Sequence, residues 1–303
     1  MPQELVIDIH THTFPNAEIG KQAMMGRGQS GYAGTIQEVL SVMQHVGISH
    51  VAMVNMTPVQ EMRMAALERL PHDTSARAMA LAERQQLAEM ISRVVRRNEW
   101  TCGVSREHPE LFAFIGLVPE MGSEAMLDEL EDKLAKGARG LKLHPAECAF
   151  YPANPALWPV YRRCEELDLA VLAHSGEFFL PMESARLRFF VPVLRDFPQL
   201  KLVLAHLGKP DFAEAREIAA TFPNAYFDTS TAITGGQHDH QVPPGEEVRL
   251  IREIGVERVL FGTDFPWLSQ ERDFEFISRL ALSDGERRAI LGENAARLLG
   301  LTS

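Results

Sequence analysis

Two histidines with one residue between them, His10 and His12, close the first apolar stretch of the chain. The stretch begins Leu5-Val6-Ile7, and such a run predicts a β-strand. Alternate side chains of a strand point to one face, so both imidazoles are expected to face the same way at its C-terminal end. Two imidazoles side by side on a rigid strand supply half of a tetrahedral or trigonal-bipyramidal metal shell. The alternative is a polar strand exit, and the choice depends on whether other ligands lie nearby.

Further side chains that can bind a metal or move a proton stand at the ends of later apolar stretches. They are Lys142, His144, His174, His206 and Asp264. Each alone could cap a strand, form a turn or make a salt bridge. Parallel strands bring their C-terminal ends to one face, so residues that repeatedly occupy strand exits are expected to converge. This convergence predicts a metal centre with catalytic side chains around it.

Eight short apolar strands, each followed by a helix, are predicted to position these residues. Continuous apolar runs suit parallel strands that are buried on both faces. The predicted strands cover residues 5–12, 50–55, 111–118, 139–145, 170–176, 201–208, 225–230 and 258–266. Eight such units in 303 residues indicate an α/β fold, a (β/α)8 TIM barrel, in a single domain over residues 1–303. A doubly wound sheet is the alternative, but it needs a phosphate loop after the first strand, which the sequence lacks.

Two long connections stand out. Residues 57–106, between the second and third strands, are predicted as a helical excursion, because their apolar residues recur at intervals of three and four. Their Met and Ala content suits either core or an oligomer surface, which leaves a homo-oligomer open. Residues 13–34 are predicted as a loop; residues 26–31 match a dinucleotide fingerprint in letters but stand too far from the strand to act as one. Residues 35–38 predict a capping box that starts a helix ending at Gly47.

Composition narrows the class of protein. The formal net charge is −11 without a Lys/Arg block, which makes nucleic acid an unexpected partner. The sequence contains neither a run long enough to span a bilayer nor a signal peptide. Cys102, Cys148 and Cys164 are widely spaced, which argues against a disulfide framework and indicates a reducing compartment. We therefore expect a cytoplasmic protein, not bound to membranes, that acts on a small molecule.

Five motifs and the last helix resemble those of the amidohydrolase superfamily. They are most similar to its amidohydrolase-related (amidohydrolase 2) branch, which also holds aminocarboxymuconate semialdehyde decarboxylase and related nonoxidative decarboxylases. The resemblance covers essentially the whole chain and is specific for the superfamily, although it does not name a substrate. The motifs are Asp8-Ile9-His10-Thr11-His12, residues 140–145, residues 172–174, residues 204–208, residues 260–266 and the ending at residues 290–300.

The resemblance implies one divalent metal ion held by His10, His12, His174 and Asp264, with a catalytic or supporting role for His206. Zinc is the default for such His-rich sites, and manganese is the competitor. Some superfamily members carry a carboxylated lysine that bridges two metals at the position of Lys142. The branch in question usually uses one metal, and there Lys142 and His144 would contact substrate or be structural.

Three functions remain open. As a hydrolase of a small amide, ester or lactone, the enzyme would use a metal-activated water, with Asp264 as the proton acceptor and His206 polarising the scissile carbonyl. As a nonoxidative decarboxylase, it would use Asp264 and His206 to deliver a proton to carbon. Such a decarboxylase needs cations for its substrate, and the candidates are Lys142, Arg27, Arg186 and Arg188. The third function is an inactive metal-binding barrel.

Minor candidates complete the set. His238-Asp239-His240 repeats the His-x-His spacing, but its Gly- and Pro-rich surroundings predict a loop. Cys148 is near the predicted mouth but lacks a committed base. Glu177 is equally suited to a contact with substrate and to the surface, and Trp267 is predicted to form a wall of the pocket.

Overall fold

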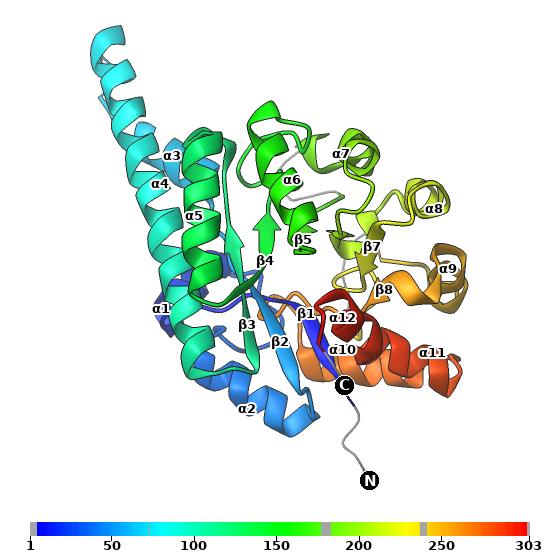
Figure 1. Ribbon diagram of the computed structural model, residues 1–303. Helices are drawn as coiled ribbons and strands as arrows, with labels where there is room; N and C mark the ends of the chain where they lie inside the picture. The colour runs from blue at the N-terminus through cyan, green and yellow to red at the C-terminus, as the bar shows by residue number, and fades with distance from the viewer. Residues whose placement is uncertain (1–4, 72, 177–182, 237–240, 302–303) are drawn as a thin grey trace.

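Eight parallel strands form the central sheet of the computed structural model, which describes residues 5–71, 73–176, 183–236 and 241–301. Each strand pairs with the next one along the chain, in the order β1 to β8 (Figure 1). This order confirms the predicted barrel. The strands are β1 Ile7–Thr11, β2 His50–Val54, β3 Leu111–Gly116, β4 Ala138–Leu143, β5 Ala170–Ala173, β6 Leu202–Leu204, β7 Ala225–Asp228 and β8 Val259–Leu260.

The barrel closes where the segment after β8 meets β1. The amide of Ile9 donates to the carbonyl of Phe261 (2.9 Å), and the amide of His12 donates to that of Phe265 (2.7 Å). The predicted eighth strand, residues 258–266, is therefore regular only at its start. Its second half leaves strand geometry but still holds β1 in place.

Helices fill the connections between the strands, as Figure 1 shows. Buried residues on α2, α5, α8 and α9 pack against the outer face of the strands. The helices are α1 Ala17–Met24, α2 Ile36–Val46, α3 Val59–Leu67, α4 Ala76–Glu107, α5 Ser123–Ala135, α6 Trp158–Glu166, α7 Val191–Asp196, α8 Phe212–Thr221, α9 Glu247–Ile254, α10 Gln270–Arg279, α11 Asp284–Arg288 and α12 Asn294–Leu298.

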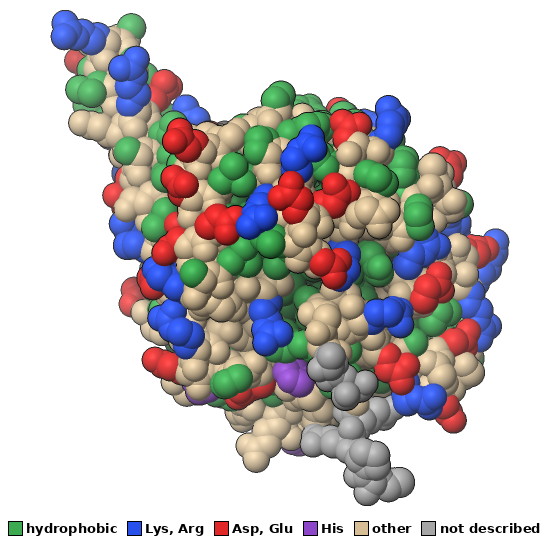
Figure 2. Space-filling view, viewed as in Figure 1, with side chains coloured by type: hydrophobic (Ala, Val, Ile, Leu, Met, Phe, Trp, Pro, Cys, Tyr) green, Lys and Arg blue, Asp and Glu red, His purple; other side chains and the backbone are tan. Residues whose placement is uncertain are grey.

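The predicted excursion between β2 and β3 is the helix pair α3 and α4. Helix α4 has 32 residues, and its first half projects beyond the barrel (Figures 1 and 2). Leu81 in that half is 57% exposed, whereas Met90, Val94 and Cys102 farther along are buried in the core. The second half of α4 is therefore an integral part of the barrel wall. Figure 2 also shows acidic and basic side chains interspersed over the visible face.

Near the N-terminus, the predicted capping box is confirmed and the predicted loop is wrong. Thr35 and Glu38 form the predicted capping box, and Gly47 ends α2 in the left-handed region with φ 87°. The predicted loop 13–34, however, contains α1. The side chain of Asn16 starts this helix by accepting a hydrogen bond from the amide of Ile19 (2.9 Å).

Apolar side chains from strands that are not neighbours meet inside the barrel. Ile7 and Ile9 of β1 share a buried cluster with Phe114 of β3, Leu172 of β5 and Val203 of β6. Gly140 on β4 leaves room for this core, since a Cβ there would lie 2.3 Å from the ring of Phe114. The packed interior fixes the strands whose C-terminal ends carry the polar residues.

Within the described residues, no helix combines the length and the apolar character needed to cross a membrane. All three cysteines are free thiols and buried. His238-Asp239-His240 and Glu177 lie outside the described residues.

Candidate metal centre

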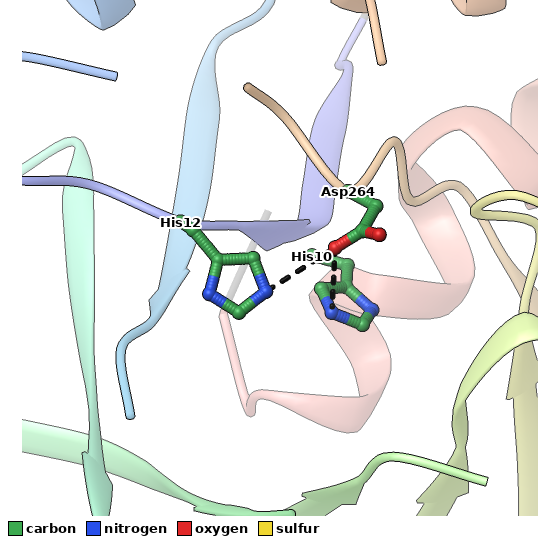
Figure 3. Close-up of side chains that lie close together, drawn as sticks. All are labelled: His10, His12 and Asp264. Carbon is green, nitrogen blue, oxygen red and sulfur yellow. Dashed lines mark ion pairs between the residues drawn. The ribbon is translucent and has the colours of Figure 1, made fainter. Parts of the chain in front are cut away.

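His10, His12 and Asp264 converge at the mouth of the barrel. His10 Nε2 lies 3.5 Å and His12 Nε2 lies 3.2 Å from Asp264 Oδ1. Figure 3 shows both imidazoles turned toward this carboxylate. Asp264 reaches the site from a left-handed backbone position with φ 60°, and its amide donates to the carbonyl of His10 (2.8 Å). We call these three residues the ligand group.

The ligand group has the donor chemistry that a divalent metal requires. Its two imidazole nitrogens and one carboxylate oxygen all lie within 4.8 Å of one another. Burial lowers the pKa of His10 and of His12, so both rings are neutral. Burial alone would raise the pKa of Asp264, but the hydrogen bond with His12 and the nearby charges hold it below its usual value. Neutral imidazoles with an ionised carboxylate fit zinc and manganese alike.

Asp228 orients His10 from behind. Its Oδ2 lies 2.8 Å from His10 Nδ1, so the ring donates there and keeps the lone pair of Nε2 for the ligand group. Asp228 ends β7 and is fully buried, and burial raises its pKa to about 6. It was not singled out in the sequence, although it occupies a strand end like the residues that were.

A chain of hydrogen bonds runs from Asp228 to His174. Ser230 Oγ donates to Asp228 Oδ1 and lies 2.8 Å from His206 Nδ1, which therefore donates to it. His206 Nε2 then accepts from His174 Nδ1 (3.0 Å). This order places the remaining lone pair of His174 on Nε2, the form that a metal ligand requires. We call Asp228, Ser230, His206 and His174 the orienting network.

The backbone at His206 differs from the prediction. Strand β6 ends at Leu204, whereas a strand was expected through Gly208. His206 and Leu207 have φ values of 61° and 50°, and the amide of His206 donates to Asp228 Oδ1 (3.0 Å). Asp228 thus binds the backbone of this left-handed turn as well as side chains. His206 is thereby held deep in the mouth, 3% exposed.

His174 lies beside the ligand group and packs on another predicted residue. Its ring stacks on that of His144, with centroids 4.1 Å apart and an interplanar angle of 9°. Neither ring belongs to the groups of described residues whose ligand atoms all lie within 4.8 Å of one another. The role of His174 as a ligand remains a prediction.

Lys142 and His144 reach the same place from the end of β4. Lys142 Nζ lies 3.1 Å from His10 Nε2, and burial lowers the pKa of this amine to about 8. His144 Nδ1 accepts from the amide of Glu147 (3.1 Å). Lys142 thus touches the ligand group, and its role as a bridge between metals, a substrate contact or a structural residue remains a prediction. A small cavity of about 10 Å³ opens beside Lys142 and His144.

The cavity is also lined by Arg97 of α4, which sequence reasoning missed because nothing distinguishes it from the other arginines of that helix. The three arginines that were proposed are not among the residues that line this cavity. Arg27 is exposed, and Arg186 and Arg188 are 43% and 48% exposed, where they face Asp211 and Glu183.

Two other predicted wall residues lie at the mouth. Cys148 lines the cavity, but burial raises the pKa of its thiol to about 12, which disfavours a nucleophilic role. The ring of Trp267 meets that of His12 edge-on at 5.1 Å. Trp267 therefore forms a wall of the site, as predicted.

Comparison with known proteins identifies the family. The family model described as Amidohydrolase matches residues 7–301. The chain belongs to the amidohydrolase family. It is also 25% identical over 235 residues to the 2-amino-3-carboxymuconate-6-semialdehyde decarboxylase of Dictyostelium discoideum. That match covers 67% of this chain and 65% of the relative, which is less than two thirds of the relative's length.

Solved structures share the fold of this family member. One is the 2,6-dihydroxybenzoate decarboxylase from Rhizobium, with a TM-score of 0.69, 17% identity, and coverage of 98% of this chain and 99% of that chain. Another is a dihydroxybenzoic acid decarboxylase from Polaromonas sp. JS666 with bound manganese and the inhibitor 2-nitroresorcinol. Its TM-score is 0.69 at 16% identity, and the match covers 99% of this chain and 98% of that chain. At these identities the likeness establishes the barrel fold.

Proposed function

We propose that this amidohydrolase-family protein is a metal-dependent enzyme that decarboxylates a small carboxylated substrate without oxidation. The observation that carries the proposal is Lys142, a cation that is 1% exposed and in contact with His10. Its ammonium group is a buried positive charge that a substrate carboxylate could approach, with neutral imidazoles around it and Asp264 and Asp228 as the acidic groups nearby. The named decarboxylases among the similar proteins support the same reaction class.

The proposed reaction breaks the bond between a substrate carbon and its carboxylate. The electron pair stays on the substrate, carbon dioxide leaves, and a proton is added to the carbon. His10, His12, His174 and Asp264 would hold the metal ion, which when bound acts as a Lewis acid toward substrate oxygens. Zinc and manganese both fit this donor set.

Asp264 is the proposed proton relay to carbon. Its carboxylate is ionised at rest, so it would first take up a proton from solvent and then pass it to the carbon. Its side chain is 18% exposed, whereas that of His10 is 1% exposed, so Asp264 is the member of the ligand group that can exchange protons with solvent. Lys142 stabilises the negative charge that remains on the substrate as carbon dioxide departs. The apolar cavity residues Leu117 and Val118 exclude water, which strengthens that interaction.

Hydrolysis of an amide, ester or lactone is the second candidate. The observation that favours it is the lowered pKa of Asp264. An ionised carboxylate at this position can accept a proton from an attacking water and pass it to the leaving group, while His206 polarises the scissile carbonyl. The two candidates share the ligand group. They differ in where Asp264 delivers a proton: to the substrate carbon in decarboxylation, and to the leaving group in hydrolysis.

The test separates metal binding from the reaction. Protein purified without chelator, as wild type and as Asp264→Ala, is analysed for metal per chain and then supplied with zinc or manganese. Wild type is then assayed with carboxylated aromatics, lactones and amides, for release of carbon dioxide and for hydrolysis. Carbon dioxide release that depends on metal and on Asp264 supports decarboxylation, and hydrolysis alone supports the second candidate.

The metal stoichiometry has its own consequences. About one ion per chain that is lost in the variant supports the mononuclear site. About two ions per chain support a carboxylated Lys142 as a bridge. Failure to take up either metal contradicts both enzymatic proposals and also rules out an inactive metal-binding barrel.

A further inference from the structure

Arg97 brings a second positive charge to the cavity from outside the barrel. It lies on α4, and its Nη2 donates to the carbonyl of Thr13. Its guanidinium carbon lies 4.6 Å from the ring centroid of Trp100 and 5.3 Å from that of Phe14. Thr13 and Phe14 directly follow His12, so these contacts anchor Arg97 beside the ligand group.

The hydrogen-bonding capacity of Arg97 is largely unused. A guanidinium has five N–H donors, and the described residues provide one acceptor, the Thr13 carbonyl. No carboxylate oxygen of the described residues lies within 4.0 Å of it. The preceding residue on the same helix, Arg96, shows the contrast, because it is 59% exposed and pairs with Glu89 at 3.1 Å. Arg97 is the more enclosed of the two and the one without an acidic partner.

A guanidinium held in this way is suited to an anion. Two aromatic rings and one carbonyl fix its position, and burial lowers its pKa to about 9, which still leaves it charged at neutral pH. Enclosing a charge without a counter-charge is costly, and a ligand that brings one removes that cost. The planar fork matches a carboxylate, which accepts two parallel hydrogen bonds.

We propose that Arg97 is a binding subsite for a carboxylate that the substrate keeps throughout the reaction. A strong ion pair on the departing carboxylate would stabilise the ground state and slow its loss, because negative charge leaves that group in the transition state. A pair with a second, retained carboxylate instead positions the substrate without opposing the reaction. This inference rests on the proposed decarboxylation, and it names the substrate class as small organic dicarboxylates.

The test measures binding, so it does not depend on turnover. Isophthalate is compared with 3-carbamoylbenzoate, and terephthalate with 4-carbamoylbenzoate; each pair keeps shape and removes one charge. Dissociation constants are measured by calorimetry on zinc- or manganese-loaded wild type, Arg97→Met, Arg97→Lys and the control Arg96→Gln. Thermal unfolding and metal content are recorded for every protein.

Wild type and Arg96→Gln are expected to prefer the dicarboxylate of at least one pair by roughly 10- to 100-fold, the value of a charge-assisted bidentate contact. Arg97→Met is expected to lose this preference while still binding the monoanions and the metal. Arg97→Lys is expected to keep part of it. Arg97→Lys also serves as the second variant if Arg97→Met does not fold.

Two outcomes overturn the subsite. One is a wild type without preference for the dicarboxylate in either geometry. The other is an Arg97 variant that keeps the wild-type preference. A clear preference in a protein that releases no carbon dioxide from any substrate would uphold the subsite and contradict the decarboxylase, so the two failures are distinguishable.

Discussion

The ligand group and the orienting network occupy the same barrel mouth but are built differently. In the ligand group, Nε2 of His10 and of His12 face one carboxylate oxygen, and the carboxylate of Asp264 is partly exposed. In the orienting network, side chains are joined one to the next, and both Asp228 and Ser230 are fully buried. The first arrangement leaves its donor atoms available to a metal ion, whereas the second joins Asp228, Ser230 and His206 to His174. The difference indicates that Asp228, Ser230 and His206 orient the ligands, and that His174, a proposed ligand, connects the two groups.

Replacing one histidine of the ligand group and one of the orienting network tests the difference between them most directly. His12→Ala removes a proposed ligand and is expected to lower metal affinity by roughly 100-fold or more, with loss of activity. His206→Ala is expected to lower activity by roughly 10²- to 10⁴-fold while metal affinity stays within about tenfold. Affinity is measured by competition with a chelator. Equal losses of metal affinity in the two variants would show that the division is wrong.

Asp228→Asn tests the hydrogen bond that links the orienting network to His10 of the ligand group. An amide at this position can donate toward His10 Nδ1, which favours the ring form with its proton on Nε2, where the metal would bind. Metal affinity is expected to fall roughly 10- to 100-fold. Asp273→Asn is the matched control, because Asp273 is also buried but accepts from the amide of Gly235 instead of a histidine. If both substitutions lower affinity equally, a general effect of burial explains the loss.

Because of Lys142, we expect the affinity of the ligand group for a metal ion to depend on pH. Burial lowers the pKa of its amine to about 8, so the amine is charged below this pH and neutral above it. The charged form repels a cation bound at His10 Nε2, so metal affinity is expected to rise as pH increases through about 8. The rise is expected to be roughly tenfold, and chelator competition between pH 6.5 and 9 measures it. Lys142→Met should flatten the profile, and a step that persists in this variant would assign it to another group.

Ser230→Ala should have the smallest effect on metal affinity, and it tests how the orienting network fixes the ring form of His206. It removes the acceptor that defines the ring form of His206, although the carbonyl of residue 230 lies 3.2 Å from the same nitrogen and remains. Metal affinity is expected to change only severalfold. The diagnostic readout is the ¹⁵N shifts of the His206 and His174 ring nitrogens in metal-free protein. Unchanged shifts would mean that the carbonyl alone fixes the ring form.

The sequence was sufficient to predict the barrel, because eight mainly apolar strands alternate with helical segments, and some helix boundaries are marked, as by the capping box at Thr35. It also predicted which strand ends meet, and His10, His12, Lys142 and Asp264 do lie together. It could not reveal Asp228, since a carboxylate at a strand end looks the same in sequence whether it faces solvent or, as here, bonds to His10, His206 and Ser230. Arg97 was hidden for a different reason: the sequence does not show which side of α4 faces the cavity, and this separates Arg97 from exposed Arg96.

The backbone bond between the Asp264 amide and the His10 carbonyl joins residues that lie almost a chain length apart. During synthesis His10 and His12 are made before their third partner, Asp264, which follows all eight strands. A chain that stops before β8 therefore lacks both the closing seam of the barrel and the carboxylate of the ligand group. Capture of a metal ion at this site would thus report that β8 and the segment after it have been made, and it would fasten β1 to that segment.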